Sequence, residues 1–201
     1  MKIIAGKWGG RELARRVNPK MRPTSDKVRE AIFGIVEARK PDEWEKTRVL
    51  DLFAGTGAMG FEALSRGAGF VSFVDNHLKT TKEIQKSLRE FEQSENTEVI
   101  CKGALDAIAW LNKQGREFDL IILDPPYRED WVLATLNRLH AEPILASRGL
   151  VVAEHDKRES LSRVEGFWTL LNSRRYGDTC ISFFCTKKAE TFWKNYFPEE
   201  K

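Results

Sequence analysis

The sequence has few of the residues from which secreted scaffolds and metal centres are built. Its three cysteines, Cys101, Cys180 and Cys185, form no CxxC pair, and its three histidines are scattered along the chain. An odd number of cysteines without paired spacing argues against a disulfide framework and against a structural zinc site. We therefore expect a protein without a bound metal that resides in the reducing cytoplasm.

Long apolar runs are also missing. No segment approaches the about 20 apolar residues that a membrane-spanning helix needs, and the first residues lack the apolar core of a secretory signal. Internal repeats and low-complexity linkers are not found either. With 201 residues and 41% hydrophobic content, the chain is long enough for one domain with a sizeable core. We expect a monomer that does not associate with membranes.

Charge of both signs is present, but it is unevenly placed. The formal net charge is +3. Residues 1–29 hold nine Lys or Arg and two acids, a net of +7, so the remaining residues sum to −4. A basic arm on a slightly acidic body favours a polyanionic partner, although a solvated basic face is an equal alternative.

From about residue 47 the chain alternates short apolar runs with longer helical patterns. Such alternation indicates a mostly parallel sheet covered by helices on both faces. Two later apolar segments, 167–171 and 180–185, are joined without a helix, which is typical of an antiparallel hairpin. The sequence thus predicts an α/β fold with seven strands. The first five strands are expected at 48–53, 70–75, 99–101, 118–124 and 149–154, with helices at 59–66, 78–91, 105–111 and 131–140.

The two ends of the chain differ from this pattern. Residues 1–46 combine a short glycine-broken strand with a helix that Thr24 or Ser25 can cap. We interpret residues 1–46 as a small strand and helix appendage to a main domain over residues 47–186. Residues 187–201 form a tail, and its aromatic side chains are expected to dock on the body: Phe192, Trp193, Tyr196 and Phe197.

A glycine-rich turn follows the first sheet strand. Gly55 and Gly57 let the backbone turn tightly and approach a ligand at the edge of the sheet where ligands bind. Residues 55–60 also spell GxGxxG, and Asp75 lies 20 residues beyond Gly55, so NAD is an alternative ligand. Asp51 argues against NAD, because a carboxylate there would repel a pyrophosphate and suits a cationic ammonium such as that of S-adenosylmethionine. Asp75 would then bind the ribose hydroxyls.

The turn Asp124-Pro125-Pro126-Tyr127 ends the fourth expected strand at the same edge of the sheet. The prolines stop the strand because they cannot donate to a sheet ladder. Their carbonyls and Asp124 are acceptors beside a flat ring. An exocyclic base amine is a poor nucleophile, and acceptors on its N–H bonds can aim its lone pair at a sulfonium methyl. The motif predicts methyl transfer to a base taken out of its stack, and an ordinary proline turn is the alternative.

Together, these motifs resemble the RsmD family of bacterial ribosomal RNA guanine-N2 methyltransferases. The resemblance covers residues 1–186 and rests on segments 2–11, 22–33, 51–68, 119–127 and 176–179. It implies a Rossmann-like class I methyltransferase fold, with S-adenosylmethionine as the methyl donor. It also implies methylation of one guanine at N2 in small-subunit (16S) ribosomal RNA, on a partly or fully assembled 30S particle.

The resemblance also assigns roles to residues. The predicted catalytic turn is Asp124, Pro125, Pro126 and Tyr127. The predicted cofactor-binding residues are Asp51, Phe53, Ala54, Gly55, Thr56, Gly57, Asp75, Asn76, Ala104 and Leu105. The predicted RNA-binding residues of the basic arm are Lys7, Trp8, Arg11, Arg15, Arg16, Arg22, Thr24 and Arg29. For Trp8, burial in a small hairpin is at least as consistent with the sequence as stacking on a base.

One position departs from the family pattern. Similar proteins often carry an acid near the adenine amine after the third strand, where this chain has Gly103. Asp106 either substitutes for that acid or faces solvent.

Two other functions share these features. A DNA adenine-N6 or cytosine-N4 methyltransferase uses the same turn, although 201 residues leave little room for a separate target-recognition region. A non-catalytic RNA-binding module would keep the fold alone, and the intact acids at Asp51, Asp75 and Asp124 argue against it.

Overall fold

The computed structural model describes residues 2–13, 26–38, 44–126, 130–159, 161, 164 and 166–197. The chain forms two compact units, residues 1–107 and 108–201. The first unit joins the expected N-terminal appendage to the first half of the expected main domain. Five predicted site residues lie outside the described ranges: Arg15, Arg16, Arg22, Thr24 and Tyr127.

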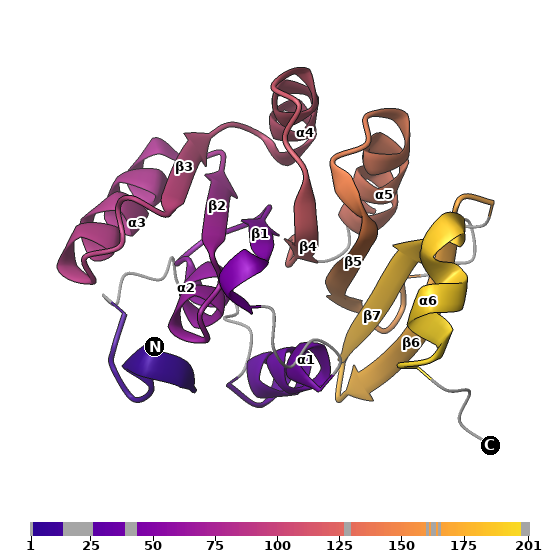
Figure 1. The fold of residues 1–201 in the computed structure, drawn as a ribbon, viewed down its shortest axis with the longest axis horizontal. Coiled ribbons are helices and arrows are strands. Elements are labelled where there is room, and N and C mark those ends of the chain that lie inside the picture. Colours follow the sequence, from indigo (N-terminus) through magenta and orange to yellow (C-terminus); the bar gives the residue numbers. More distant parts are fainter. Residues whose placement is uncertain are drawn as a thin grey trace. The chain divides into compact units, whose positions relative to one another are not determined.

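A three-stranded parallel sheet forms the centre of the first unit. Its strands are β1 (Arg48–Asp51), β2 (Phe70–Asp75) and β3 (Thr97–Cys101), and they lie in the order β3-β2-β1. Helix α2 (Ala58–Ser65) connects β1 to β2, and helix α3 (Leu78–Glu90) connects β2 to β3 (Figure 1). Both helices lie where the apolar periodicity predicted them.

Aromatic side chains join these helices to the sheet. The centroid of the Phe61 ring of α2 lies 5.4 Å from that of Phe73 in β2 and 5.5 Å from that of Phe91, directly after α3. Trp8 contacts Phe91 edge to face, at a centroid distance of 4.8 Å. Such pairs contribute about 0.5–1.5 kcal/mol each beyond area burial. The N-terminal segment is therefore part of the same core.

The N-terminal segment folds as a small hairpin followed by a helix. An antiparallel bridge pairs Lys2 with Glu12 around the short helical turn η1 (Gly6–Trp8). Helix α1 (Asp26–Glu37) and the turn η2 (Trp44–Lys46) come before β1. The apolar side of α1 is buried through Val28, Ile32, Phe33, Ile35 and Val36.

The second unit contains four strands. They are β4 (Phe118–Leu123), β5 (Leu145–Asp156), β6 (Trp168–Tyr176) and β7 (Thr179–Thr186), in the order β4-β5-β7-β6. Strands β4 and β5 are parallel, whereas β7 is antiparallel to both β5 and β6. Helix α4 (Ala104–Lys113) begins in the first unit and ends in the second, and α5 (Trp131–Ala141) connects β4 to β5.

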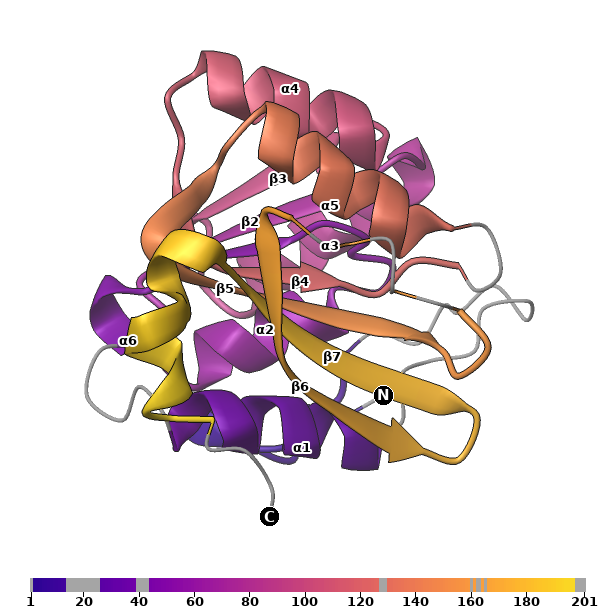
Figure 2. The same cartoon turned by 90° about the vertical axis from the view of Figure 1, so that its right-hand side faces the viewer.

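The predicted C-terminal hairpin is confirmed, with longer strands than expected (Figure 2). The connection expected over residues 172–179 contracts to Gly177 and Asp178. Gly177 has a φ of +67°, a value that glycine adopts without steric cost. The described residues of the two units form seven strands, and the predicted α/β class is confirmed.

The tail packs against the hairpin in the second unit. It forms the turn η4 (Lys187–Ala189) and the short helix α6 (Glu190–Lys194). Trp193 and Phe197 are buried, and the Phe197 ring centroid lies 5.4 Å from that of Phe183 in β7. Tyr196 is exposed. The expected docking face is thus made by Trp193 and Phe197, and the Phe197 N–H donates to the Trp193 carbonyl at 3.0 Å in the turn that follows α6.

Two classes of feature are not found in the described ranges. No helix there is both long and apolar enough to cross a membrane. No group of three or more His, Cys, Asp or Glu side chains lies close enough together there to hold a metal ion.

Candidate active site

The glycine-rich turn connects β1 to α2 at the carboxyl end of the three-stranded sheet. Gly55 and Gly57 have φ angles of +52° and +80°, in the left-handed region that favours glycine. The Gly57 N–H donates to the Ala54 carbonyl at 2.6 Å, and the Ala54 N–H donates to the Val74 carbonyl of β2 at 2.8 Å. These bonds hold the turn against the neighbouring strand.

Gly60, the third glycine of the GxGxxG spacing, has a packing role. A Cβ at Gly60 would lie 2.1 Å from an edge carbon of the Phe73 ring, so a larger residue would force α2 away from β2. The Gly60 N–H donates to Oδ2 of Asp51 at 2.9 Å. Turn geometry, helix packing and this bond account for all three glycines without a pyrophosphate.

Asp51 is a buried carboxylate, and one of its two oxygens has no hydrogen-bond partner within the described residues. Its side chain is 1% exposed, and Oδ1 has no hydrogen-bond partner in the described structure. Burial raises the pKa of Asp51 to about 7, the Gly60 hydrogen bond opposes the rise, and the charge of Asp75 adds to it. A buried acceptor without a partner is costly. A cationic donor would both satisfy Oδ1 and neutralise the carboxylate.

Asp75 closes the turn from the end of β2. Its Oδ2 accepts the Gly55 N–H at 3.0 Å, and its Oδ1 accepts the His77 N–H at 2.8 Å. The side chain is half-buried. Each carboxylate oxygen has a second lone pair, so Asp75 can still accept hydrogen bonds from a ligand's hydroxyl groups.

The other predicted cofactor residues lie at the same edge of this sheet. Because β1, β2 and β3 are parallel, the segments that follow them lie at one edge of the sheet. Phe53 and Thr56 in the turn and Leu105 in the first turn of α4 are half-buried. Ala54 and Ala104 are buried, and Asn76 is exposed.

Gly103 has room for the side chain that similar proteins carry. A Cβ there would meet one atom within 4 Å, Oδ2 of Asp106 at 3.8 Å. Asp106 is exposed in the first turn of α4. The Asp106 carboxylate is therefore close enough to Gly103 to take the place of the missing acid.

The Asp-Pro-Pro turn leaves β4 in the second unit. The parallel pairing of β4 with β5 ends at Leu123 and Ala153, as the two prolines predicted. Asp124 is half-buried, Pro125 is buried and Pro126 is exposed. The turn thus lies at the carboxyl end of a parallel strand, the position where ligands bind in such sheets.

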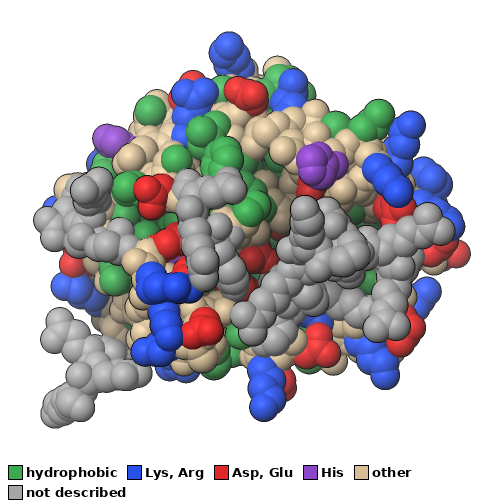
Figure 3. Space-filling model, turned by 180° about the vertical axis from the view of Figure 1, so that it is seen from behind, with side chains coloured by type: hydrophobic (Ala, Val, Ile, Leu, Met, Phe, Trp, Pro, Cys, Tyr) green, Lys and Arg blue, Asp and Glu red, His purple; other side chains and the backbone are tan. Residues whose placement is uncertain are grey.

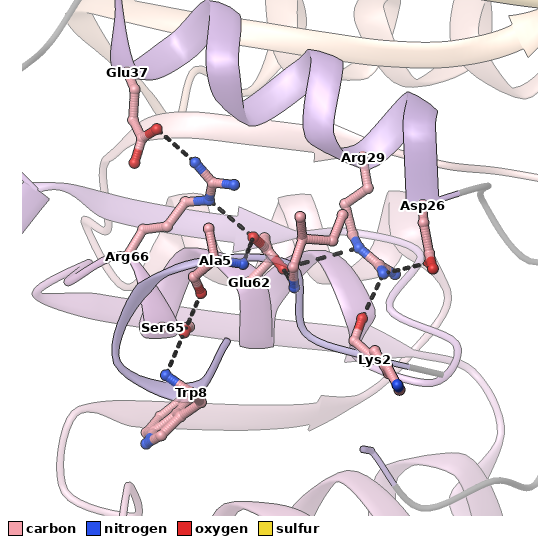
Figure 4. A network of polar contacts seen from close by, with 10 residues as sticks. Lys2, Ala5, Trp8, Asp26, Arg29, Glu37, Glu62, Ser65 and Arg66 are labelled. Carbon is pink, nitrogen blue, oxygen red and sulfur yellow. Dashed lines mark hydrogen bonds and ion pairs between the residues drawn. The ribbon is translucent and has the colours of Figure 1, made fainter. Parts of the chain in front are cut away.

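Two residues expected to contact RNA are buried instead. Trp8 is 7% exposed, which agrees with the alternative of a hairpin core residue. Arg29 is 0% exposed, so its expected contact with RNA is corrected. Its Nη2 donates to the Lys2 carbonyl at 2.6 Å and to Asp26 at 2.8 Å (Figure 4). Arg29 shares the inward side of α1 with Ile32 and Phe33, and its bond to the Lys2 carbonyl joins the N-terminal hairpin to α1.

Glu62 of α2 is a buried residue for which the sequence predicted no role. Its Oε2 accepts the Ile4 N–H at 2.7 Å, and its Oε1 accepts the Ala5 N–H at 3.1 Å and the Arg66 Nε–H at 2.9 Å. Figure 4 shows this carboxylate between the arm and α1. The signal in the sequence is an acid within an apolar helix, since acids are rarely buried without partners.

Lys7 and Arg11 are exposed, as expected for RNA contacts. The Lys7 Nζ lies 4.4 Å from the Trp8 ring centroid and donates to Oε1 of Gln93 at 3.2 Å. The Arg11 guanidinium carbon lies 4.0 Å from the Phe91 ring centroid. Both cations are oriented by aromatic side chains, which leave their charge unneutralised.

Comparison with known proteins identifies a family. The family model described as Conserved hypothetical protein 95 matches residues 1–185. The Ribosomal RNA small subunit methyltransferase D of Haemophilus influenzae is 33% identical over 178 residues, which cover 88% of this chain and 89% of that protein. The sequence resemblance to the RsmD family is thereby confirmed over the predicted extent.

Solved structures share the fold. A hypothetical protein of Thermus thermophilus matches with a TM-score of 0.76 and 26% identity, covering 91% of this chain and 98% of that one. A 16S rRNA N2 methyltransferase of the same organism, solved with AdoMet and guanosine, has a TM-score of 0.63, 19% identity and coverage of 80% and 43%. The predicted Rossmann-like methyltransferase fold is confirmed.

Proposed function

The chain belongs to the Conserved hypothetical protein 95 family, and from this membership we propose that it methylates N2 of a guanine in small-subunit (16S) ribosomal RNA, with S-adenosylmethionine as the methyl donor. A relative at 33% identity carries the name Ribosomal RNA small subunit methyltransferase D. The observation that carries the proposal is the buried Asp51 carboxylate, which keeps one unpartnered oxygen beside the glycine-rich turn.

The residues of the turn fit the donor. The unpartnered Oδ1 of Asp51 would bind the ammonium of the methionine part, and the Asp75 carboxylate would accept hydrogen bonds from the ribose hydroxyls. Gly55 and Gly57 allow close approach of the backbone, and Ala104 and Leu105 border the adenine. S-adenosylmethionine supplies an electrophilic methyl group on a sulfonium.

The Asp-Pro-Pro turn acts on the base in this proposal. Asp124 and the Pro125 carbonyl accept the N–H bonds of the guanine amine and direct its lone pair toward the methyl group. Tyr127 stacks on the base, which is worth about 1–3 kcal/mol. Asp124 needs no raised pKa, because a methylated aryl ammonium loses its proton readily.

Because the proposed substrate is a guanine of 16S ribosomal RNA, the proposed partner is the small ribosomal subunit. We place the target in the 30S particle, partly or fully assembled, and the protein acts on it as a cytoplasmic monomer. Exposed Lys7 and Arg11, with Arg15, Arg16, Arg22 and Thr24, contact the RNA.

Labelled methyl transfer tests the proposal. The wild-type chain is incubated with radiolabelled S-adenosylmethionine and 30S particles from cells that lack the protein, and the RNA is digested to nucleosides. We expect one new labelled product, N2-methylguanosine. Asp124→Ala should lower turnover about 100-fold or more, with cofactor affinity kept within about twofold. Label in duplex DNA but not in the particles, or Asp124→Ala with wild-type turnover, would contradict the proposal.

A further inference from the structure

The described part of the arm and the glycine-rich turn lie at opposite ends of α2 within the first unit. The arm packs on the carboxyl ends of two helices, because the Trp8 N–H donates to Oγ of Ser65 at 2.9 Å and the Trp8 ring contacts Phe91. The turn lies at the amino end of α2. At about 1.5 Å per residue, α2 and α3 are about 12 and 20 Å long. An RNA held by the arm must therefore cross the surface of this unit to reach the cofactor residues.

Helix α3 carries cations along one exposed side. Lys79, Lys82, Lys86 and Arg89 are all exposed, and their spacings of three and four residues put them on one side of the helix. We call these four residues the α3 stripe. Buried Ile84 and Leu88 face away from it. The stripe begins directly after the segment that holds Asp75 and ends just before Phe91.

Two acids of the same helix, Glu83 and Glu90, lie by the same spacing rule on the side of the stripe and neutralise part of its charge. Glu83 is half-buried. Oε1 of Glu90 lies 3.8 Å from Nζ of Lys86, and both side chains are exposed. Exposed pairs of this kind contribute about 0.3–0.5 kcal/mol, so the pair would yield readily to a phosphate.

The stripe continues onto the arm. Arg11 lies over Phe91 and Lys7 bonds to Gln93, which puts both arm cations at the carboxyl end of α3, beyond Arg89. Figure 3 shows exposed Lys and Arg side chains interspersed with Asp and Glu side chains on the visible face. The four stripe residues and the two arm cations therefore form a row of six exposed cations, interrupted by the carboxylates of Glu83, Glu90 and Glu92.

We propose that the α3 stripe, with Lys7 and Arg11, is a track that binds the RNA backbone and leads it from the N-terminal hairpin to the cofactor end of the first unit. The inference rests on the proposed function, because it assigns the RNA substrate to this surface. Recognition is by phosphate charge, so it is independent of base sequence and sensitive to salt.

Matched charge variants test the track. The first variant, Lys82→Gln with Lys86→Gln and Arg89→Gln, removes three stripe cations. The control, Lys113→Gln with Lys187→Gln and Lys188→Gln, removes three exposed cations from elsewhere. Glutamine has a helix propensity close to those of lysine and arginine, so circular dichroism and cofactor affinity should be unchanged in both.

The measurement is the dissociation constant for a fluorescent mixed-sequence RNA duplex, between about 50 and 200 mM salt. The stripe variant should bind at least about tenfold more weakly at low salt, and its log–log salt slope should flatten by about 2. The control should change affinity less than about twofold. Equal losses in both variants, or wild-type affinity and slope in the stripe variant, would overturn the track.

A methyl-transfer assay on 30S particles separates this inference from the proposed function. If the wild-type chain methylates the RNA while the stripe variant binds the duplex normally, the track fails and the function stands. If stripe removal abolishes duplex binding but no preparation methylates ribosomal RNA, the track stands and the function fails.

Discussion

Two carboxylates are buried near opposite ends of helix α2, and they differ in how many partners they have. Asp51, beside the first residues of α2, uses one oxygen on the Gly60 N–H and keeps the other unpartnered. Glu62, in the last turns, has partners on both oxygens: two backbone N–H groups of the arm and the Arg66 guanidinium. Burial is the same, so burial alone does not distinguish a ligand site from a structural one. The carboxylate oxygen without a hydrogen-bond partner is what distinguishes the ligand site.

Removing Glu62 should have the largest effect. Glu62→Ala would leave the Ile4 and Ala5 N–H groups and the Arg66 charge without their acceptor. Loss of one partner from such a buried network costs about 3–5 kcal/mol, and urea denaturation would measure the drop in unfolding free energy. A loss below about 1 kcal/mol would show that water replaces the carboxylate and that Glu62 is not what holds the arm.

Changing Asp51 should affect binding rather than stability. Asp51→Asn keeps the shape and removes the charge that we pair with the cofactor ammonium. We expect S-adenosylmethionine affinity to fall at least about tenfold, which is about 1.4 kcal/mol, by calorimetric titration. Unfolding free energy at pH 8 should stay equal or rise, since the buried charge is gone. A variant that unfolds easily but binds normally would reverse the roles of the two acids.

The Asp51 pKa gives this contrast a pH dependence. The folded-state pKa of about 7 lies above the unfolded value of 3.8, so the folded chain holds the proton more tightly. Asp51 therefore costs nothing below about pH 4, and its cost grows as pH rises to 7 and is complete above it. Over that pH range the unfolding free energy of wild type should fall by up to about 4 kcal/mol relative to that of Asp51→Asn. If the unfolding free energies of the two proteins changed equally between pH 5 and pH 8, the raised pKa of Asp51 would be contradicted.

Cofactor affinity should change in the opposite direction. The ammonium pairs with the ionised carboxylate, so wild-type affinity should rise up to about tenfold per pH unit below pH 7 and level off above it. Asp51→Asn should show a flat profile, which is its control. A wild-type profile equally flat would mean that Oδ1 of Asp51 does not meet the ligand's charge.

The smallest effect is expected at Gly103. Gly103→Asp adds a carboxylate where there is room for it, next to Asp106. Asp106→Ala alone should weaken S-adenosylmethionine binding about threefold, which is about one hydrogen bond's net contribution. Adding Gly103→Asp to that chain should restore the wild-type affinity. No change in either variant would mean that neither acid contacts the ligand.

Periodicity located the central elements closely. The expected strand over 70–75 is β2 as observed, and the helix expected over 78–91 is α3, one residue shorter. Strand β5 begins four residues earlier than the expected 149, because Leu145 and the residues after it extend the pairing beside β4 without an apolar run. Local pattern marks where apolar residues recur, whereas strand ends depend on the neighbour they pair with.

Some site residues could be predicted from local sequence, and others depend on tertiary contacts. Asp51, Asp75 and the two turn glycines were predicted because they follow apolar strands, and parallel strands bring their carboxyl ends to one edge. Arg29 was expected to contact RNA and is buried, and Glu62 was not expected at all. For Arg29 the local sequence does not show which side of α1 will be covered, whereas the one local sign at Glu62 is that it is an acid within an apolar helix.

The amino-acid sequence alone determined the class of fold, the family and the residue types of the cofactor turn, since these depend on the order of short segments and on covalent preferences of glycine and proline. Only the tertiary structure decided which charges are structural and which remain exposed. Segments distant along the chain bury Arg29 against Lys2 and Glu62 against Ile4, while Lys82 and Lys86 stay in solvent. Burial of a side chain depends on contacts between such distant segments. A charge that these contacts remove from water must be paired inside the protein, whereas a charge left in water can bind a ligand.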